Sequence, residues 1–215
     1  MDTANSSDLA ARILDTAIAL AEQRSWESIR LYEVAAAAGI SLDDIRQHFR
    51  EKDELIDAWF DRADAAMLRL AAKPEMAQLC ARERLRLLIM GWLDALEPHH
   101  RVTRQMILAK CEPGHIHIQI PALMRISRTV QWMREGALLQ DASLRRAIAE
   151  TVTTSIYLAT FVCWLGDDTA GSERAARLLD RMLLAAEQAA LTIPGFATTQ
   201  PASRRDDTAH SAAGR

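Results

Sequence analysis

Residues 31–49, LYEVAAAAGISLDDIRQHF, constrain the fold more narrowly than any other stretch of this chain. Apolar residues recur at near-helical spacing before and after a central turn. Gly39 suits the left-handed conformation that ends a helix. Ser41, followed three residues later by Asp44, forms a capping-box pattern that starts the next helix. The stretch is therefore predicted to be a helix-turn-helix with residues 42–48 as the recognition helix.

The flanking segments complete a small helical unit. Residues 1–6 are polar and are expected to form a loose arm before a helix over about residues 8–24 with one apolar stripe. A fourth helix, running from Lys52 past Leu70, is long enough to leave this unit and to connect it to the rest of the chain. Proline and turn signals then divide the remainder into further helices. They are expected at about residues 81–96, 100–110, 121–137, 143–165 and 172–191.

Composition supports an all-α protein. The chain is 49% hydrophobic and has only 8 Gly and 6 Pro in 215 residues, which favours long helices. Its 3 cysteines are too few and too scattered for a disulfide framework, so a reducing cytoplasm is expected. The polar, acidic start is unlike a secretory signal. The most apolar run, residues 156–165, is too short to span a bilayer, so no membrane insertion is expected.

Three segments of the chain carry a resemblance to a known family: ILDTAIALAEQ, EVAAAAGIS and HFREKDEL, all within residues 12–60. Together they resemble the N-terminal unit of the TetR family of bacterial transcriptional regulators. The resemblance implies a homodimer that binds double-stranded DNA through this unit. It also implies a C-terminal body that binds a small molecule and dimerises through its last two helices. Less specifically, TVQW, YLATFVCWLGDD and LLDRMLLAAE resemble the lipid-binding protein of ubiquinone biosynthesis that shares this fold.

The resemblance supplies a domain organisation. Residues 1–51 would form the helix-turn-helix DNA-binding domain. Residues 52–193 would form a helical domain for ligand binding and dimerisation, in which residues 52–72 are the connector helix. Residues 194–215, rich in Thr, Ala, Ser and charge, are predicted to be a disordered tail.

The resemblance also points to DNA contacts. Arg46 stands where the family usually has a DNA-contacting tyrosine, and an arginine there can pair with phosphate or guanine. Leu42 could touch a thymine methyl, and Lys52 would hold a DNA phosphate as its counterpart does in the family. The full candidate set is Arg30, Ser41, Leu42, Asp43, Asp44, Arg46, Gln47, His48 and Lys52.

Charge argues in the opposite direction. Residues 1–60 hold six Lys or Arg and twelve Asp or Glu, a net charge of −6. Because phosphate contacts dominate protein–DNA affinity, this balance opposes strong binding. Acidic residues in the first turn of a helix, such as Asp43 and Asp44, also stabilise the helix dipole, and a basic face can coexist with an acidic one. Both interpretations stay open from the sequence.

The body holds many large or pliable apolar side chains on several helices. An ordinary helical core explains any one of them, but Met and Trp also tolerate irregular packing around an apolar ligand such as an acyl chain. No cluster of buried charge is indicated. The candidate ligand-binding residues are Met90, Leu93, Met106, Met124, Trp132, Tyr157, Phe161 and Trp164. In the last helix, intramolecular core and dimer interface are both possible for Leu179, Met182, Leu183 and Ala186.

Catalytic motifs are not found. The chain has no Gly-rich phosphate loop, nucleophile elbow or paired-carboxylate signature, so no enzyme activity and no cofactor are expected. Several possible zinc ligands, His99, His100, Cys111, His115 and His117, match no zinc-site spacing, and no metal is expected. Two functional hypotheses follow. One is a cytoplasmic homodimeric repressor released by a hydrophobic effector, and the other is a lipid- or metabolite-binding accessory protein whose helix-turn-helix no longer binds DNA.

Overall fold

The structure, a computed structural model, describes residues 2–110, 116–139 and 144–192, and describes no side chains at 2–5, 116–123 and 144–146. The described residues form helices joined by turns, with no strand among them, which confirms the all-α prediction. The predicted tail, residues 194–215, lies outside the described residues.

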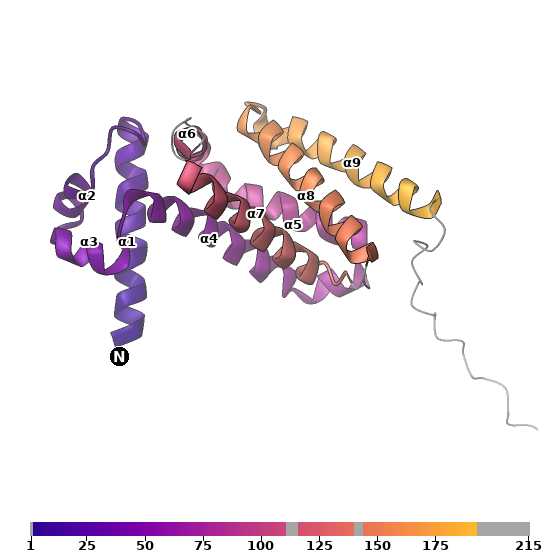
Figure 1. Ribbon diagram of the computed structural model, residues 1–215, viewed down its shortest axis with the longest axis horizontal. Coiled ribbons are helices and arrows are strands. Elements are labelled where there is room, and N and C mark those ends of the chain that lie inside the picture. The colour runs from indigo at the N-terminus through magenta and orange to yellow at the C-terminus, as the bar shows by residue number, and fades with distance from the viewer. Residues whose placement is uncertain (1, 111–115, 140–143, 193–215) are drawn as a thin grey trace, which may run out of the picture.

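Figure 1 shows α1, α2 and α3 at one end of the molecule, α4 as a connecting helix, and the later helices grouped at the other end. We call α1–α3 the head and α5–α9 the body, while α4 runs from the head into the body. The helices are α1 Asp2–Gln23, α2 Leu31–Ala38, α3 Leu42–His48, α4 Lys52–Ala71, α5 Ala81–Leu96, α6 His100–Lys110, α7 Ile116–Gly136, α8 Leu144–Leu165 and α9 Glu173–Thr192. Short 3₁₀ turns lie at Pro74–Gln78, Glu97–His99 and Ala170–Ser172.

The helix-turn-helix has the predicted bounds and the predicted capping. Gly39 has φ 67° and ψ 35°, the left-handed conformation that ends α2. The Ser41 hydroxyl accepts the Asp44 backbone N–H at 3.1 Å, and the Ser41 backbone N–H donates to Asp44 Oδ2 at 2.8 Å. Ile45 and Phe49 are buried and hold α3 against the rest of the head. Local signals therefore suffice for this element.

Replacing Gly39 by alanine should destabilise the protein by about 1 kcal/mol, because a Cβ raises the energy of the left-handed conformation. A Cβ built at Gly39 has no atom within 4 Å, so backbone strain is the whole effect. Gly166→Ala is the matched control, since its backbone is not left-handed and its nearest contact would be 3.9 Å away. Urea unfolding of both variants measures the difference. Equal stabilities would contradict the expectation.

Three helix starts differ from the prediction. α1 begins at Asp2, so residues 2–6 of the expected loose arm belong to the helix. α7 begins at Ile116, and Pro121 lies within it rather than in its first turn. α9 begins at Glu173 rather than at 172; the Ser172 hydroxyl donates to Glu97, and Asp167 Oδ2 caps the helix by accepting the Ala175 N–H at 2.9 Å. A cap is chosen by which carboxylate reaches the first turn in three dimensions, which spacing alone does not show.

The apolar segment of α8 is longer than expected. Ala147–Leu165 comprises 19 residues with a mean hydropathy of 1.4, long and apolar enough to cross a membrane, whereas the sequence pattern had marked only its second half. About a third of that window, 33%, is buried inside the protein. Core helices of soluble proteins also reach this length and hydropathy, so the finding corrects the length of the run and establishes no membrane insertion.

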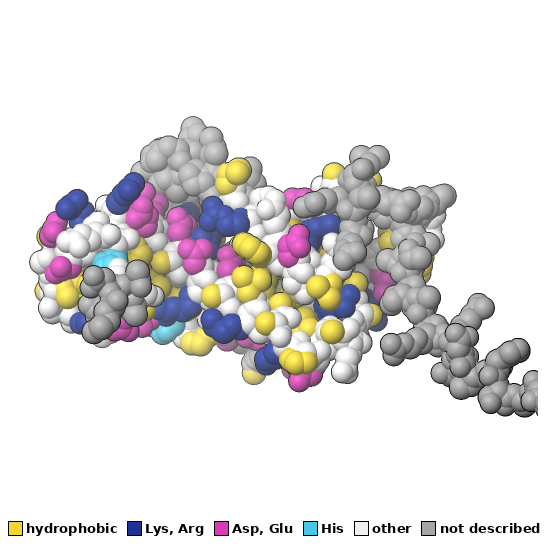
Figure 2. Space-filling model, turned by 90° about the horizontal axis from the view of Figure 1, so that it is seen from below, with side chains coloured by type: hydrophobic (Ala, Val, Ile, Leu, Met, Phe, Trp, Pro, Cys, Tyr) yellow, Lys and Arg dark blue, Asp and Glu magenta, His cyan; other side chains and the backbone are white. Residues whose placement is uncertain are grey.

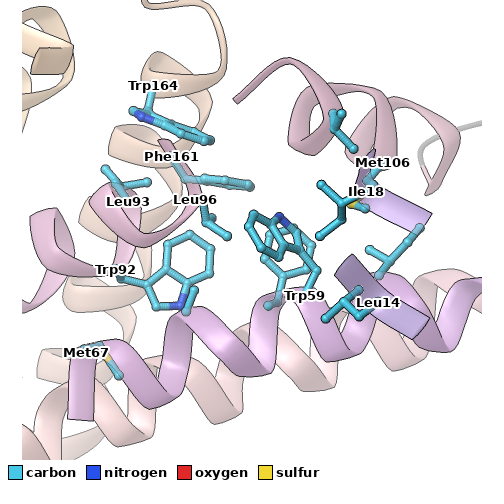
Figure 3. Packing of buried hydrophobic residues seen from close by; sticks show 14 of the residues in the cluster. Leu14, Ile18, Trp59, Met67, Trp92, Leu93, Leu96, Met106, Phe161 and Trp164 are labelled. Atoms are coloured by element: carbon cyan, nitrogen blue, oxygen red, sulfur yellow. The ribbon is translucent and has the colours of Figure 1, made fainter. Parts of the chain in front are cut away.

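Head and body share a continuous hydrophobic core. Leu14 and Ile18 of α1, Trp59 of α4, and Trp92 and Trp164 of the body belong to one buried cluster (Figure 3). Because α4 contributes to both ends of this cluster, the head is packed against the body and is not a separate domain joined only by a linker. The head and the body are therefore joined by buried packing contacts.

Polar contacts between α1 and the segment around α6 reinforce this junction. Glu22 accepts hydrogen bonds from the Arg101 guanidinium and pairs with His99 Nδ1 at 3.1 Å. Burial alone would raise the pKa of Glu22, but the hydrogen bonds with His99 and Arg101 outweigh it and hold the pKa below its usual value. The Trp26 backbone N–H donates to Gln105 Oε1 at 2.7 Å. α6 and the turn before it are thus bonded to the end of α1 and to the loop that follows it.

Candidate nucleic-acid interface and ligand cavity

The outer face of α3 presents the side chains expected to read DNA. Leu42, Arg46 and Gln47 are exposed, while Ile45 on the opposite face is buried. This division follows from the helical period, since residues three and four apart share a face. His48, at the end of the helix, is half-buried. The head therefore holds α3 with one face free to contact another molecule.

Asp43 accepts hydrogen bonds from both polar side chains on that face, Arg46 and Gln47. Its Oδ1 accepts hydrogen bonds from Arg46 Nε at 3.0 Å and Nη2 at 2.8 Å, and its Oδ2 accepts one from Gln47 Nε2 at 3.0 Å. The hydrogen bonds from Arg46 and then Gln47 hold the pKa of Asp43 below its usual value. The spacings of three and four residues that allow these contacts are visible in the sequence. To contact a base, Arg46 must either break its hydrogen bonds with Asp43 or approach the base while still paired with it.

Asp44 has a structural role instead. Its carboxylate accepts the Ser41 backbone N–H and hydroxyl, and these bonds hold the pKa of Asp44 below its usual value. Of the two adjacent aspartates in the recognition helix, one therefore caps the helix and the other orients Arg46 and Gln47. Both lie in the first turn, where a negative charge also favours the helix dipole.

Two cations of the candidate set are directed at the chain between α1 and α2. Lys52 Nζ donates to the carbonyl oxygens of Trp26, Glu27 and Ile29, the last at 3.0 Å, and lies over the Trp26 ring. Burial lowers the pKa of Lys52. Arg30 Nη1 donates to the Glu27 carbonyl at 2.6 Å. In this arrangement the Lys52 ammonium holds the loop, and a phosphate contact would have to compete with these carbonyls.

Arg50, just after α3, was outside the candidate set. It is exposed, and its side chain has no hydrogen bond or ion pair within the part of the chain that the structure describes. Its position two residues beyond the recognition helix was the signal that could have found it. On the face seen in Figure 2, Lys and Arg side chains of the head are interspersed with Asp and Glu and form no continuous basic strip.

The body contains a cavity of about 100 Å³ between α4, α5, α6, α7 and α8. Its lining is mostly aromatic and aliphatic, with three charged side chains. The lining residues are Asp57, Phe60, Trp92, Ile107, Lys110, Arg125, Ile126, Thr129, Tyr157, Leu158 and Phe161. The cavity thus combines apolar walls with a small number of polar groups, which is the usual character of small-molecule sites.

The structure distributes the ligand candidates among three environments. Two of them, Tyr157 and Phe161, line the cavity. Met90 is half-buried, and Leu93, Met106 and Trp164 are fully buried in the core without lining it. Met124 and Trp132 lie on the surface, with 63% and 47% of their area exposed. Apolar character marks residues that avoid water, but it does not show which of them border an empty volume.

The body contains a group of partly or fully buried charges that the sequence did not indicate. Asp64 of α4 accepts hydrogen bonds from Trp92 Nε1 at 2.7 Å and from the Thr129 hydroxyl at 3.1 Å. Arg125 of α7 pairs with Asp61 at 2.9 Å and lies 3.6 Å from Asp64, and Lys110 of α6 pairs with Asp57 at 3.1 Å. These charges come from three helices far apart in the sequence, so no local motif announces them.

The dimer candidates of α9 divide between core and surface. Leu179 and Leu183 are buried within the protomer, and Met182 and Ala186 are half-buried. From Ala147 onward, the exposed side chains of α8 are uncharged and partly apolar, and α9 adds exposed leucines. The exposed apolar residues of these helices are Ile148, Val152, Val162, Leu184 and Leu191.

The possible zinc ligands do not gather in the described structure. Among the described residues, no group of three His, Cys, Asp or Glu side chains could hold a metal ion. His99 pairs with Glu22, and His100 Nε2 lies 2.8 Å from the Trp164 carbonyl oxygen. Cys111, His115 and the side chain of His117 lie outside the described residues.

The family model and three solved structures that match this chain belong to one group of regulators. The family model for bacterial regulatory proteins of the tetR family matches residues 13–59. A TetR transcriptional regulator from Nitrosomonas europaea is 51% identical over 84% of this chain and 99% of its own, with a TM-score of 0.75. TetR-type regulators from Rhodococcus sp. RHA1 and Streptomyces coelicolor share the fold at 17% and 20% identity, over 86% and 85% of this chain and 98% and 83% of their own, with TM-scores of 0.60 and 0.58. No curated protein matches the chain.

Proposed function

Because this chain belongs to the TetR family of bacterial transcriptional regulators, we propose that it is a cytoplasmic repressor that binds a palindromic operator as a homodimer and is released by a small, largely hydrophobic effector. The observation that supports DNA binding best is the capped helix-turn-helix with one exposed face on α3. Residues 1–51 would bind DNA, and residues 52–193 would bind the effector and dimerise. The matched relatives are described as regulators, and a catalytic role is not proposed.

In the proposed complex, α3 enters the major groove. Arg46, Gln47 and Leu42 would face base edges, while Ser41, His48 and Arg50 would lie near the backbone. Two heads related by a twofold axis would occupy successive major grooves, so the operator would be roughly palindromic. The exposed apolar residues of α8, together with the exposed leucines of α9, would supply an apolar surface for the second copy.

α6 supports a route from the cavity to the head. Ile107 and Lys110 line the cavity; on the same helix, Arg101 bonds to Glu22 at the end of α1 and Gln105 bonds to Trp26 in the loop that follows. A ligand that prefers one position of α6 would therefore shift the position of the head, as population shift requires. The spacing of the two heads in a dimer would change, and the operator would be released.

The accessory-protein alternative has its own support. Residues 1–60 hold twice as many Asp and Glu as Lys and Arg, and both Arg46 and Lys52 have internal partners. In this alternative the helix-turn-helix is a structural remnant, and the protein binds a lipid or metabolite without binding DNA. The resemblance of the body to the lipid-binding protein of ubiquinone biosynthesis belongs to this alternative and stays a prediction.

The deciding experiment is a fluorescence anisotropy titration with the full chain, repeated across a salt series. The labelled duplex is DNA from the region upstream of the gene that encodes this protein. We expect specific binding. The logarithm of the association constant should fall linearly with the logarithm of the salt concentration, with a slope of about −0.9 for each phosphate contact. A scrambled duplex of equal length is the control. Absence of binding even at low salt would eliminate the repressor and favour the accessory protein.

Replacing Asp43 by asparagine should raise the affinity for DNA of any sequence at low salt. The substitution removes a negative charge from the groove-facing helix in each protomer, and it weakens the hold on Arg46 and Gln47. We also expect the ratio of operator to scrambled-duplex affinity to fall, because the two side chains lose their fixed orientation. Asp168→Asn, an exposed charge change in the body, is the control for net charge. Unchanged affinity for both duplexes would show that Asp43 does not face DNA.

A further inference from the structure

The cavity walls favour a flat ring. Phe60 and Trp92 lie parallel, with ring centroids 5.7 Å apart and planes at 2°, and Tyr157 and Phe161 meet Trp92 edge-on at 5.3 and 5.4 Å. Figure 3 shows Trp92 and Phe161 on neighbouring helices of the body core. An apolar cavity of roughly 150 Å³ holds a benzene molecule. The cavity of about 100 Å³ therefore has room for one ring after slight widening, and not for several.

Arg125 brings an unsatisfied donor to this space. Its Nη1 pairs with Asp61 at 2.9 Å, and its guanidinium lies 5.6 Å from the centre of the Phe60 ring. Its Nη2 is buried, has no hydrogen-bond acceptor in the described structure, and stands 3.6 Å from Asp64, beyond hydrogen-bond distance. A buried N–H without an acceptor is unfavourable, so an oxygen atom supplied by a ligand would stabilise this arrangement.

Tyr157 offers a second donor on the lining. Its side chain is buried, yet its hydroxyl has no hydrogen bond to any described residue. Burial raises the pKa of this hydroxyl, so it keeps its proton and can donate. Asp64, the nearby acid, already accepts from Trp92 and Thr129, which leaves the Tyr157 and Arg125 donors for another acceptor.

The charges on the lining are arranged by depth. The cationic side chains Lys110 and Arg125 are 11% and 14% exposed, whereas their partners Asp57 and Asp61 are 43% and 62% exposed. The cations therefore lie deeper than the carboxylates that balance them. Asp57 and Asp61 can turn to solvent when an anion enters, and the two cations then remain beside the ligand.

We propose that the cavity binds a single-ring aromatic carboxylate, whose ring lies among Phe60, Trp92 and Phe161 and whose carboxylate accepts hydrogen bonds from Arg125 and Tyr157. Lys110 adds a second positive charge. The assignment rests on the proposed function only in that the same cavity would receive the effector. It narrows that effector from any small hydrophobic molecule to an aromatic acid.

The test compares benzoate with toluene, which has the same ring and no acceptor, by titration calorimetry on the full chain without DNA. Hydrogen bonds between charged groups are stronger than neutral ones. We therefore expect the protein to bind benzoate at least about tenfold more tightly than toluene. Tyr157→Phe should weaken benzoate severalfold and leave toluene unchanged, and it removes no existing hydrogen bond. Arg125→Met should weaken benzoate about tenfold or more, whereas Arg128→Met, an exposed change one turn away, should not.

Several results would overturn the assignment. They are equal affinity for benzoate and toluene, no effect of Tyr157→Phe on benzoate, or no binding of either compound. None of these bears on DNA binding, which the salt series measures separately. If benzoate binds as expected but leaves the DNA complex intact, the ligand class stands and the proposed release mechanism fails.

Discussion

Replacing Arg46 by alanine is expected to weaken operator binding by about 1–3 kcal/mol for each protomer, because that is the usual value of a bidentate base contact. A symmetric dimer has this interaction twice, so the total loss is about 2–6 kcal/mol. Asp43 would keep its hydrogen bond with Gln47, so the substitution removes only the DNA contact made by Arg46. Anisotropy with the operator duplex at fixed salt measures the loss, and the full chain is used throughout.

The same titration separates two roles for Arg46. If it reads a base, Arg46→Ala weakens the operator complex and leaves scrambled DNA nearly unchanged. If it binds phosphate, both complexes weaken and the magnitude of the salt slope falls by about one unit for each phosphate that is no longer neutralised. Arg69→Ala, an exposed arginine near the end of α4, is the charge-matched control. Operator binding that is unaffected by Arg46→Ala but abolished by Arg50→Ala would move the principal DNA-binding side chain to the end of α3.

Replacing Asp64 by leucine is expected to destabilise the fold by about 3–5 kcal/mol, because removal of one member of a buried charged network leaves its partners unsatisfied. Trp92 Nε1 and the Thr129 hydroxyl would lose their acceptor, and Arg125 would lose a nearby negative charge. Urea unfolding monitored by circular dichroism measures the loss. Asp61→Leu is the control, since Asp61 is mostly exposed and exposed pairs contribute about 1 kcal/mol or less.

Asp64 also predicts a pH dependence. Burial raises the pKa of Asp64 above its ordinary value of 3.8, although the hydrogen bonds from Trp92 and Thr129 and the charge of Arg125 oppose this. The native state therefore holds this proton more tightly than the unfolded chain. The stability contributed by the protonated group is complete below pH 3.8 and is lost as the pH rises through the raised value. Asp64→Asn cannot ionise there, so its stability relative to the wild type should rise over that window. A constant difference would contradict the raised pKa.

The helix-turn-helix could be predicted from the sequence because its determinants are local. Gly39, Ser41 and Asp44 act within one turn of where they stand, and Ile45 and Phe49 follow from helical period. The hydrogen bonds from Arg46 and Gln47 to Asp43 are equally local. Their spacing of three and four residues could have been interpreted before the structure was known.

Other parts of the candidate sites depend on residues far apart in the chain. The orientation of Lys52 toward three carbonyl oxygens requires the loop between α1 and α2 to pass beside the start of α4. The cavity requires five helices to leave a gap, which no single helical pattern records. Apolar candidates such as Trp132 and Met124 therefore fell on the surface, while the charged lining residues Arg125 and Lys110 were not anticipated.

By itself, the sequence determined the helical class, the helix-turn-helix with its caps, and the family resemblance, because each depends on neighbours within a few residues. The tertiary structure decided which charges are buried, which apolar residues border the cavity, and which cations are already held by the protein. Those outcomes depend on how helices pack, and packing joins Asp64, Lys110 and Arg125 across 61 residues of chain that carry no common signal. The chemistry of the ligand cavity is thus a property of the assembled helices, whereas the shape of the DNA-facing unit is a property of one short stretch.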